Sequence, residues 1–584
     1  MAATPSDPSH GSPLPGVPAR TASLVLGPLL RHVGEHDATI WVETDAPATV
    51  EVCAGPSIGA ERTFAVAGHH YAIVALEGLP SGSCEPYEVR VDGRLVWPEA
   101  TSVYPPSVIR TIDPAKPLRA LFGSCRSPAA VKVKDPTGSG DDVLAGYARR
   151  MAVQKAPDWP EVLFMLGDQV YADETSEPTR DYLRARRDTT RAPFTQVADF
   201  EEYAHLYAEA WREPDVRWLF SVLPTSMIFD DHDVLDDWNT SRSWRDEMQA
   251  THWWEERITG ALMSYWVYQH LGNLSPAGLA ADATYAAVRA EADGEAVLRA
   301  FAQAADREAD GARGARWSYR RDLGRVRLLI IDSRAGRVLN DGHRLMVGEA
   351  EFRWIEEQVT DGAYDHLVIG TSVPWLLPRA LHDVESASEA LCDGSRGAVV
   401  ARLSEHVRRA VDLEHWAAFS DSFERLVRLI ARVGRGEAGV PAPATICVVS
   451  GDVHHTYISE ATFGRPMASR VYQLTCSPMH NGIPLAMRLV FTVAWNRFAA
   501  GVTRRLVRLA RAKPPTIDWT TTAGPFFGNH LAALRFDGRA VQFGLQKSAL
   551  NGLRTVATPV AEATRDLTAP RETAPIRATP EPVA

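Results

Sequence analysis

The chain has 584 residues, of which 45% are hydrophobic and 23% are charged, and its formal net charge is −11. This composition is typical of a soluble globular protein, and the length allows more than one domain with a large core. The negative charge argues against a nucleic-acid-binding protein. No run of about 18 uninterrupted apolar residues is present, so no membrane span is expected.

Residues 1–21 are rich in Pro and Ser and are predicted to form a disordered tail. The start of the chain lacks the basic and apolar regions of a secretory signal and also lacks a twin-arginine motif, so we expect a cytoplasmic protein. Six cysteines do not suggest a disulfide scaffold in a chain of this length. Cys53 and Cys84 could form a disulfide within the N-terminal region. We favour the alternative, in which both are free buried thiols.

Short alternating segments separated by Gly, Pro and Asp turns fill residues 22–112, among them Ala38–Glu43, Thr49–Cys53 and Tyr87–Val91. This pattern predicts a small antiparallel sandwich, immunoglobulin- or fibronectin-like. From 117 to 548, apolar strand-like runs alternate with helical stretches, which indicates an α/β fold with its sheet covered on both faces. Residues 556–584 are rich in Thr, Pro and Ala and are predicted to form a second disordered tail.

Two strand-like runs near the start of the α/β region end in residues that can bind metals. Leu118–Arg126 closes on Gly and delivers Cys125 at its end, although a buried structural thiol is the more common role for a single Cys. Val162–Tyr171 ends in Gly-Asp, and Asp168 and Tyr171 share a face if a helical turn begins there.

Two later runs end in the same way. Ser226–His232 finishes with Asp231 and His232, and more carboxylates follow at Asp233, Asp236 and Asp237. Buried together without a cation, these carboxylates would repel one another; a solvated acidic loop is the alternative. The run Ile446–Val449 leads into Ser-Gly-Asp-Val-His-His, where Asp452 and His454 point the same way in an extended chain and His455 points the opposite way.

Four motifs in this order, Gly-Ser-Cys, Gly-Asp-x-x-Tyr, Asp-Asp-His-Asp and Gly-Asp-Val-His, resemble those of the alkaline phosphatase D (PhoD)-like metallophosphatases, a branch of the calcineurin-like metallophosphoesterase superfamily. The segments Ile331–Arg334 and Gly370–Trp375 also resemble family segments. The resemblance implies a calcineurin-like β-sandwich flanked by helices, preceded by a small all-β domain. It also implies hydrolysis of phosphate esters at a centre with two metal ions.

The resemblance assigns the metal ligands as follows. Ferric iron is expected at a site with one thiolate, one phenolate, one carboxylate and one imidazole, from Cys125, Tyr171, Asp168 and His454. Calcium is expected at a second site of hard oxygens, where Asp168 bridges to the carboxylates of Asp231 and Asp452. Thiolate and imidazole suit a transition metal, and carboxylates suit calcium, so the donor types agree with this assignment.

The resemblance also implies roles around the substrate. His232 would lie on the phosphate side and would stabilise developing charge or protonate the leaving oxygen. Arg126 would contact phosphate, with an ion pair as the equally favoured alternative. His455 is a weaker candidate for substrate binding. Asp332 and Arg334 resemble a family segment but could equally form a structural pair at a strand end. Ser372 occupies the position where simpler calcineurin-like enzymes carry another metal-binding His.

The expected substrate is a small phosphate ester or a lipid head group, and the choice between phosphatase and phosphodiesterase stays open. A catalytically inactive or regulatory binding protein, possibly on a membrane surface, is the alternative function. Residues 485–513 carry a helical apolar stripe followed by arginines. This helix either lies on anionic lipid as a peripheral contact or packs its stripe on the domain, and we favour packing.

Overall fold

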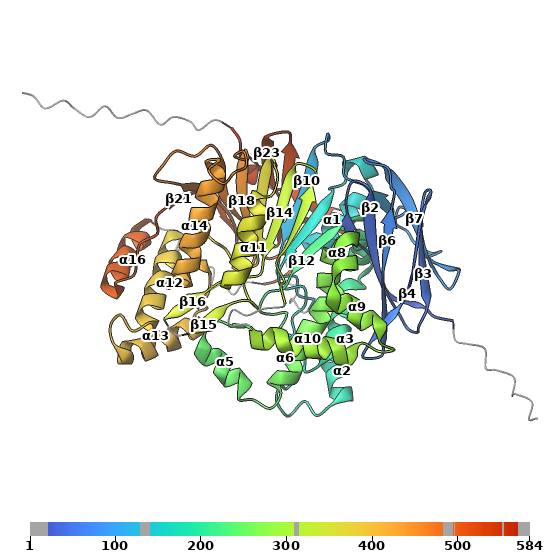
Figure 1. Ribbon diagram of the computed structural model, residues 1–584, viewed down its shortest axis with the longest axis horizontal. Helices are drawn as coiled ribbons and strands as arrows, with labels where there is room; N and C mark the ends of the chain where they lie inside the picture. Colours follow the sequence, from blue (N-terminus) through green and yellow to red (C-terminus); the bar gives the residue numbers. More distant parts are fainter. Residues whose placement is uncertain are drawn as a thin grey trace, which may run out of the picture.

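The computed structural model describes residues 21–128, 141–308, 315–340, 342–482, 495, 497–551 and 554–569. Strands of the N-terminal part lie at one end of the molecule, helices α12 (Arg379–Cys392), α13 (Ala398–Ala410) and α16 (Arg497–Ala510) lie at the other, and large sheets stand between them (Figure 1). The tail predicted over 1–21 falls outside the described residues except for Thr21.

Two antiparallel sheets form the N-terminal part. In β3, the buried side chains of Val50 and Val52 alternate with the more exposed Thr49 and Glu51, as the alternating sequence predicts. The first sheet has the order β1 (Leu24–Val33), β2 (Asp37–Thr44), β6 (His69–Glu77), β5 (Phe64–Val66). The second has the order β4 (Ser57–Arg62), β3 (Thr49–Ala54), β7 (Cys84–Val91), β8 (Arg94–Trp97), with β9 (Val108–Arg110) also on β7. The all-β N-terminal region is therefore confirmed.

Two further sheets, each of seven strands, form the centre of the molecule. The first has parallel strands β10 (Leu118–Gly123), β11 (Val162–Leu166) and β12 (Thr225–Ile228), and antiparallel strands β22 (His530–Asp537), β23 (Ala540–Asn551), β24 (Arg554–Pro559) and β25 (Arg565–Asp566). The second has parallel strands β14 (Val326–Ile331), β17 (His366–Thr371), β18 (Thr445–Ser450) and β20 (Arg470–Thr475), and antiparallel strands β13 (Tyr319–Leu323), β19 (Thr456–Thr462) and β21 (Asp518–Phe526).

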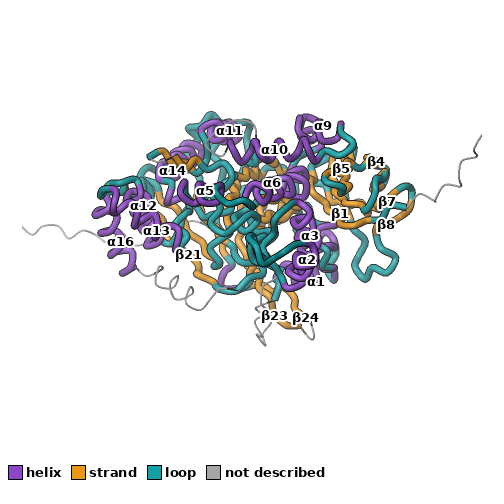
Figure 2. Tube along the Cα trace, turned by 90° about the horizontal axis from the view of Figure 1, so that it is seen from below, coloured by secondary structure: helices purple, strands orange, loops and turns teal. Residues whose placement is uncertain are grey.

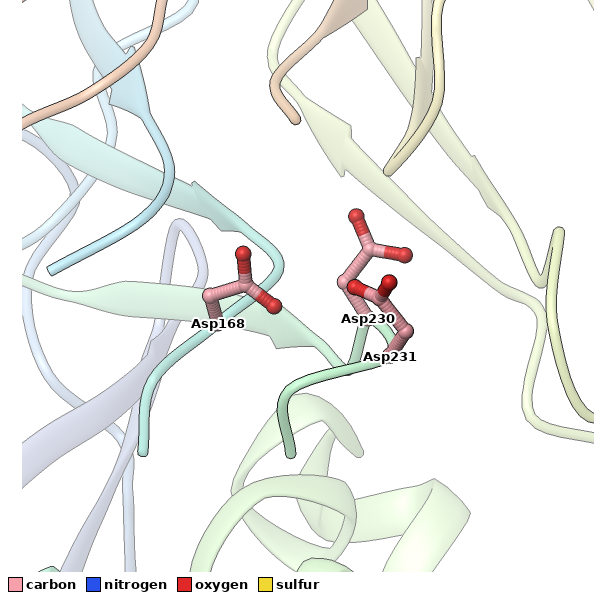
Figure 3. Close-up of side chains that lie close together, drawn as sticks. All are labelled: Asp168, Asp230 and Asp231. Atoms are coloured by element: carbon pink, nitrogen blue, oxygen red, sulfur yellow. The ribbon is translucent and has the colours of Figure 1, made fainter. Parts of the chain in front are cut away.

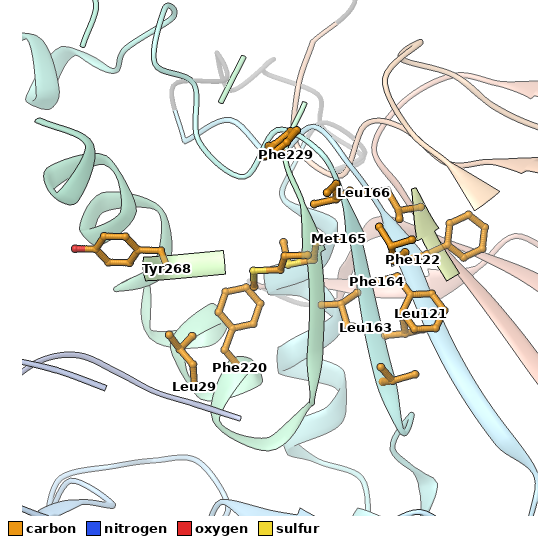
Figure 4. Close-up of a cluster of buried hydrophobic side chains, with 14 of the residues drawn as sticks. Leu29, Leu121, Phe122, Leu163, Phe164, Met165, Leu166, Phe220, Phe229 and Tyr268 are labelled. Atoms are coloured by element: carbon orange, nitrogen blue, oxygen red, sulfur yellow. The ribbon is translucent and has the colours of Figure 1, made fainter. Parts of the chain in front are cut away.

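The central strands are buried on both faces, which explains their continuous apolar sequences. On β14, Leu328 and Ile330 belong to the core shared with the first sheet, whereas Leu329 and Ile331 belong to a core that includes α11 and α14. Figure 4 shows side chains from β10 and β11 packed with Phe220 of α4 in the shared core.

The helices surround these sheets (Figure 2). Besides the three named above, they are α1 (Val143–Ala152), α2 (Glu177–Arg186), α3 (Phe200–Trp211), α4 (Pro214–Val222), α5 (Arg242–Gln249), α6 (Trp254–Ser264), α7 (Leu271–Asn273), α8 (Pro276–Ala281), α9 (Ala283–Ala290), α10 (Glu295–Glu308), α11 (Glu349–Thr360) and α14 (Ser420–Gly434). The predicted α/β organisation is thus observed. No helix of the described part is long and apolar enough to cross a membrane.

Three expectations from the sequence differ from the structure. The second tail does not begin at 556, because β24 pairs with β23 and Leu567 is buried against the sheet; residues 570–584 lie outside the described residues. Cys53 and Cys84 are free thiols, but Cys84 is exposed rather than buried. In α16, Val502 and Leu506 of the predicted stripe are exposed, and residues 483–494 lie outside the described residues.

Candidate metal centre

Three buried aspartates gather where β11 and β12 end. Asp168 follows β11, and Asp230 and Asp231 follow β12, its neighbour in the sheet. One ligand oxygen from each lies within 4.8 Å of the others (Figure 3). Burial raises the pKa of all three carboxyls, and repulsion from neighbouring acidic groups adds to each shift. A cation placed among them would relieve both costs.

The cluster contains carboxylate oxygens without partners. Oδ1 of Asp168 and Oδ2 of Asp230 are buried and accept no hydrogen bond from the described residues. Asp233, in contrast, is fully used: its Oδ2 accepts the backbone N–H groups of Asp168 and Asp230, each at 2.9 Å. Asp233 therefore joins the two loops, while the free oxygens of Asp168 and Asp230 are the kind of atom that a bound cation satisfies.

Cys125 and Tyr171 surround Asp168 on another side. The Cys125 Sγ lies 3.1 Å from Asp168 Oδ2 and accepts a hydrogen bond from Ser477 at 3.1 Å. Burial raises the pKa of Cys125 to about 12, and the nearby Asp452 adds to the shift. The phenol of Tyr171 is buried and accepts a hydrogen bond from Asn481 at 3.0 Å. A metal would stabilise the thiolate and phenolate that burial disfavours.

The end of β18 brings Asp452 and His454 to the same site. Gly451 allows the approach, because a Cβ there would lie 2.0 Å from the Ser124 Oγ, which accepts the Asp452 N–H at 3.1 Å. Burial lowers the pKa of His454 to about 4, so its imidazole is neutral and able to ligate at neutral pH.

Four candidate ligands have left-handed backbone conformations, with φ of 56° at Cys125, 52° at Asp168, 67° at Asp452 and 50° at His454. Non-glycine residues adopt this region at a cost, and the surrounding structure must enforce it. Each residue stands one or more positions beyond the end of a parallel strand. The chain thus turns sharply at these positions, just beyond the ends of the strands.

His232 lies beside the cluster, and one of its ring nitrogens is hydrogen-bonded to Asp173. Its Nδ1 is 3.0 Å from both carboxylate oxygens of Asp173, and its ring stacks on Tyr171 with centroids 4.5 Å apart. Burial opposes protonation, but Asp173 outweighs it and holds the pKa of His232 well above its usual range. Its Nε2 is 4.0 Å from the Asp236 Oδ1.

A second imidazole reaches the site from a distant segment. The Nε2 of His415 lies 2.8 Å from Asp452 Oδ2, and its Nδ1 lies 2.5 Å from Glu385 Oε1. Burial disfavours the Asp452 carboxylate, but the bond to His415 and the charge of Arg334 prevail and keep its pKa below its usual range. Ser372, after β17, cannot supply the imidazole that simpler calcineurin-like enzymes carry there. His415 brings a ring to the site from a different segment.

Arg334 is the buried counterion of the acidic cluster. It pairs with Asp230, its Nη2 lies 3.4 Å from Asp231, and its Nη1 lies 2.5 Å from Glu414. Asp332 bonds to the backbone of Arg334 rather than to its guanidinium: its carboxylate accepts the N–H groups of Arg334, Ala335 and Gly336 at the end of β14. One guanidinium therefore neutralises only part of the negative charge around Asp168.

A profile of PhoD-like phosphatases matches residues 139–494, more than half of the chain. The chain belongs to the PhoD-like phosphatase family. Metal-dependent phosphoester hydrolysis is the activity that this membership suggests. A second profile, of a domain of unknown function called DUF7800, matches residues 21–109. No curated protein matches the sequence.

Solved structures add evidence for the fold. One described as the structure of PhoD aligns with 94% of this chain and 90% of its own, with a TM-score of 0.54 and 11% identity. This likeness shows a shared PhoD-like α/β fold. A type III pullulan hydrolase from Thermococcus kodakarensis (12% identity, 92% and 98% covered) and a maltogenic amylase from S. marinus (10%, 92% and 79%) have TM-scores of only 0.14.

Two residues predicted from the PhoD-like motifs have other contacts in the structure. The Nε and Nη2 of Arg126 each lie 2.8 Å from Asp142, and its Nη1 donates to the carbonyl of Ala210, so its guanidinium forms the ion pair that the sequence left open. His455 is fully buried, and its ring stacks on Tyr457. Their predicted substrate contacts stay predictions.

Sequence reasoning missed Asp173, Asp230, Glu385 and His415. Asp230 had a signal, since it adjoins Asp231 in the Asp-Asp-His motif. Asp173 follows the strand-end run Val162–Tyr171 by two residues, whereas Glu385 lies within α12 and His415 in a loop, without a strand-end pattern. A cavity of about 430 Å³ is lined by residues at the amino ends of β10 and β14. It lies at the opposite ends of the strands from the acidic cluster and does not belong to the PhoD-like site.

Proposed function

We propose that this protein hydrolyses phosphate esters at a centre of two cations, within a calcineurin-like arrangement of the two central sheets. The observation that carries the proposal is the buried cluster of Asp168, Asp230 and Asp231 with its unpartnered oxygens. Cys125 on one side of Asp168 and the carboxylates on the other make two donor sets of different chemistry. Residues 22–112 would form a separate N-terminal domain.

The first cation would be ferric iron. Its ligands would be the thiolate of Cys125, the phenolate of Tyr171, a carboxylate oxygen of Asp168 and the imidazole of His454. The second would be calcium, held by hard oxygens of Asp168, Asp231 and Asp452. When bound, such a pair clamps a phosphate ester and activates water for in-line attack.

The chain's own residues would bind the ester and move the proton. Asp173 fixes the His232 ring through Nδ1 and favours the imidazolium form. With Nδ1 occupied, Nε2 is the atom that would donate a proton to the leaving oxygen. Asp233 would keep the Asp168 and Asp230 loops in register, so that the carboxylates do not move apart when they bind.

The purified protein tests this proposal. We expect iron and calcium by elemental analysis, a visible absorption band from tyrosinate-to-iron charge transfer, and hydrolysis of an aryl phosphate. Cys125→Ala and Asp168→Ala should each lose iron, colour and activity together. Cys447→Ala is the matched control, because Cys447 is also a fully buried free thiol but belongs to the core between the sheets.

Loss of activity in Cys125→Ala with full metal content would show that the ligand assignment is wrong. Metal binding without hydrolysis of any ester would instead favour a regulatory binding protein. A panel of mono- and diesters, including lipid head groups and nucleotides, would identify the substrate class and separate phosphatase from phosphodiesterase activity.

A further inference from the structure

Helices α13 and α16 turn apolar side chains to the solvent. On α13 and just after it, Val399 is 81% exposed and Leu403 66%; on α16, Leu509 is 65% exposed. More than half of the large apolar side chains that are exposed in the described part of the chain belong to this set. We call it the α13–α16 face: Val399, Val400, Leu403, Val407, Val411, Val502, Leu506 and Leu509.

The spacing shows that these residues form stripes. Val399, Leu403 and Val407 follow one another at intervals of four, which places them on one side of α13. The side of α13 that is buried carries Arg408, paired with Glu405 at 3.1 Å. A surface helix of a globular protein normally buries its apolar stripe, so α13 has the reverse orientation.

Helix α16 also packs with a different side. Val507 and Ala510 are buried, and the Thr503 hydroxyl donates to Asp383 of α12 at 3.1 Å. Val502 and Leu506, at 52% and 36% exposed, lie on the more open side of the helix. Trp495, at the start of the predicted stripe, packs on the domain against the rings of His455 and Tyr457. The predicted packing therefore holds for Trp495 but not for Val502, Leu506 and Leu509, which are exposed.

The two stripes belong to one end of the molecule. Both helices contact α12 (Figures 1 and 2). The segment that leads into α13 also contacts the end of α16: the Ser395 hydroxyl donates to the Ala510 carbonyl at 2.7 Å, and the Arg396 Nε donates to the Leu509 carbonyl at 2.5 Å. An exposed apolar surface of this kind marks an interaction site.

Basic side chains accompany the apolar ones. Helix α16 contains no acidic residue, and α13 contains only one. Exposed cations on and next to the two helices are Arg402, Arg504, Arg505, Arg508, Arg511 and Lys513. A chain with a net charge of −11 thus concentrates positive charge around its exposed apolar residues.

We propose that the α13–α16 face docks the protein on a membrane surface that contains anionic lipid. Apolar side chains flanked by arginines are the pattern by which helices lie in the head-group region, and each cation near an anionic surface strengthens the binding. A second copy of the chain is less suited to the face, because a two-fold contact would bring arginines against arginines. This proposal does not depend on hydrolysis.

Vesicle flotation with the full chain tests the docking. The protein should float with vesicles of equimolar phosphatidylcholine and phosphatidylglycerol, should not float with phosphatidylcholine alone, and should bind less as salt is raised. Equal binding to both vesicles, or no binding to either, would overturn the proposal. So would a dimer in light scattering without vesicle binding, since the face would then be an interface between copies.

Variants locate the surface. Leu403→Glu with Leu506→Glu should abolish flotation, and Arg504→Glu with Arg508→Glu should lower partitioning roughly 25-fold or more, since each cation contributes about a fivefold factor. Ile58→Glu with Val153→Glu is the matched control, because those side chains are 68% and 85% exposed elsewhere. Unchanged melting temperatures and unchanged aryl phosphate hydrolysis should accompany all of them. Flotation of the first variant at the wild-type level would contradict the assignment.

Discussion

His415 lies between the buried carboxylate of Glu385 and the partly buried carboxylate of Asp452. A carboxylate on one ring nitrogen fixes the ring so that the other nitrogen acts on a metal or on one of its ligands. Because Asp452 is a proposed ligand of the second cation, His415 is well placed to orient it. The segment around His415 thus takes part in the site without any of the family motifs.

The substitution His415→Gln should lower the affinity for calcium about 10–100-fold, as is typical when a group that orients a metal ligand is lost. The visible band of the iron site should stay, because Cys125 and Tyr171 are untouched. Calcium titration by equilibrium dialysis measures the effect. His366→Gln is the control, since this buried imidazole bonds to Thr445 at the opposite end of the strands. Wild-type calcium affinity would exclude the role.

Asp173 should set the alkaline limit of activity through His232. Asp173 holds the pKa of His232 above its usual range, so the imidazolium persists to higher pH and is lost as pH rises through that pKa. Asp173→Asn removes the charge and lowers the pKa. We therefore expect the alkaline limb of the kcat/KM profile on an aryl phosphate to move to lower pH. An unmoved limb would show that His232 is not the proton donor.

At the scale of elements, the site depends on how closely β10 and β18 approach. The Gly451 backbone lies against the side chain of Ser124, which follows β10. Gly451→Ala should separate the two strand ends, lower the free energy of unfolding by about 1–3 kcal/mol and weaken metal binding. Urea unfolding and metal analysis check this. Gly464→Ala, where no atom lies within 4 Å of the added Cβ, should change neither.

An ion pair across elements should make stability depend on pH. His69 of β6 lies 2.8 Å from Glu43 of β2 and 2.8 Å from Glu201 of α3. Burial opposes its protonation, yet the two carboxylates raise the pKa of His69 to about 9. Since this is above the unfolded value of about 6.5, the stabilisation is complete below 6.5 and is lost as pH rises towards 9.

We therefore expect His69→Gln to be less stable than the wild type by roughly 2 kcal/mol at pH 6, after a discount for solvent screening of the partly exposed ring. The difference should shrink as pH rises and nearly vanish above pH 9. Urea unfolding at several pH values measures it. A difference that does not change with pH would mean that the ring contributes by packing alone.

At the scale of the whole molecule, the acidic cluster couples metal binding to stability. Buried carboxylates with raised pKa values destabilise the metal-free fold at neutral pH, because they must either ionise in an apolar site or take up protons. Calcium in excess should raise the stability by about 2.7 kcal/mol at a hundred times its Kd, and a chelator should reverse the gain.

Calorimetry with and without calcium checks this coupling. Asp168→Asn should melt at or above the temperature of the metal-free wild type, since one repelling charge is gone, but calcium should no longer raise its melting temperature. A metal-independent melting temperature in the wild type would show that the cluster is not a cation site.

The sequence alone determined the α/β architecture, the all-β N-terminal region and the position of the main acidic residues. Parallel strands that are buried on both faces have continuous apolar sequences, so they can be recognised in the sequence. Their carboxyl ends meet at one edge of a sheet, which places the residues that follow them close together. Cys125, Asp168, Asp231 and Asp452 follow directly from this rule. So does the contact between Cys125 and Asp168, at 3.1 Å.

Only the tertiary structure decided which other groups reach that edge. Asp173 and His415 come from loops and Glu385 comes from α12, so their approach depends on how those segments pack. The same holds for Arg126, whose guanidinium turns to Asp142, and for α13, whose apolar stripe points outward. Local sequence specifies the strands and their ends; the pairing of distant side chains is settled by packing, which no single segment encodes.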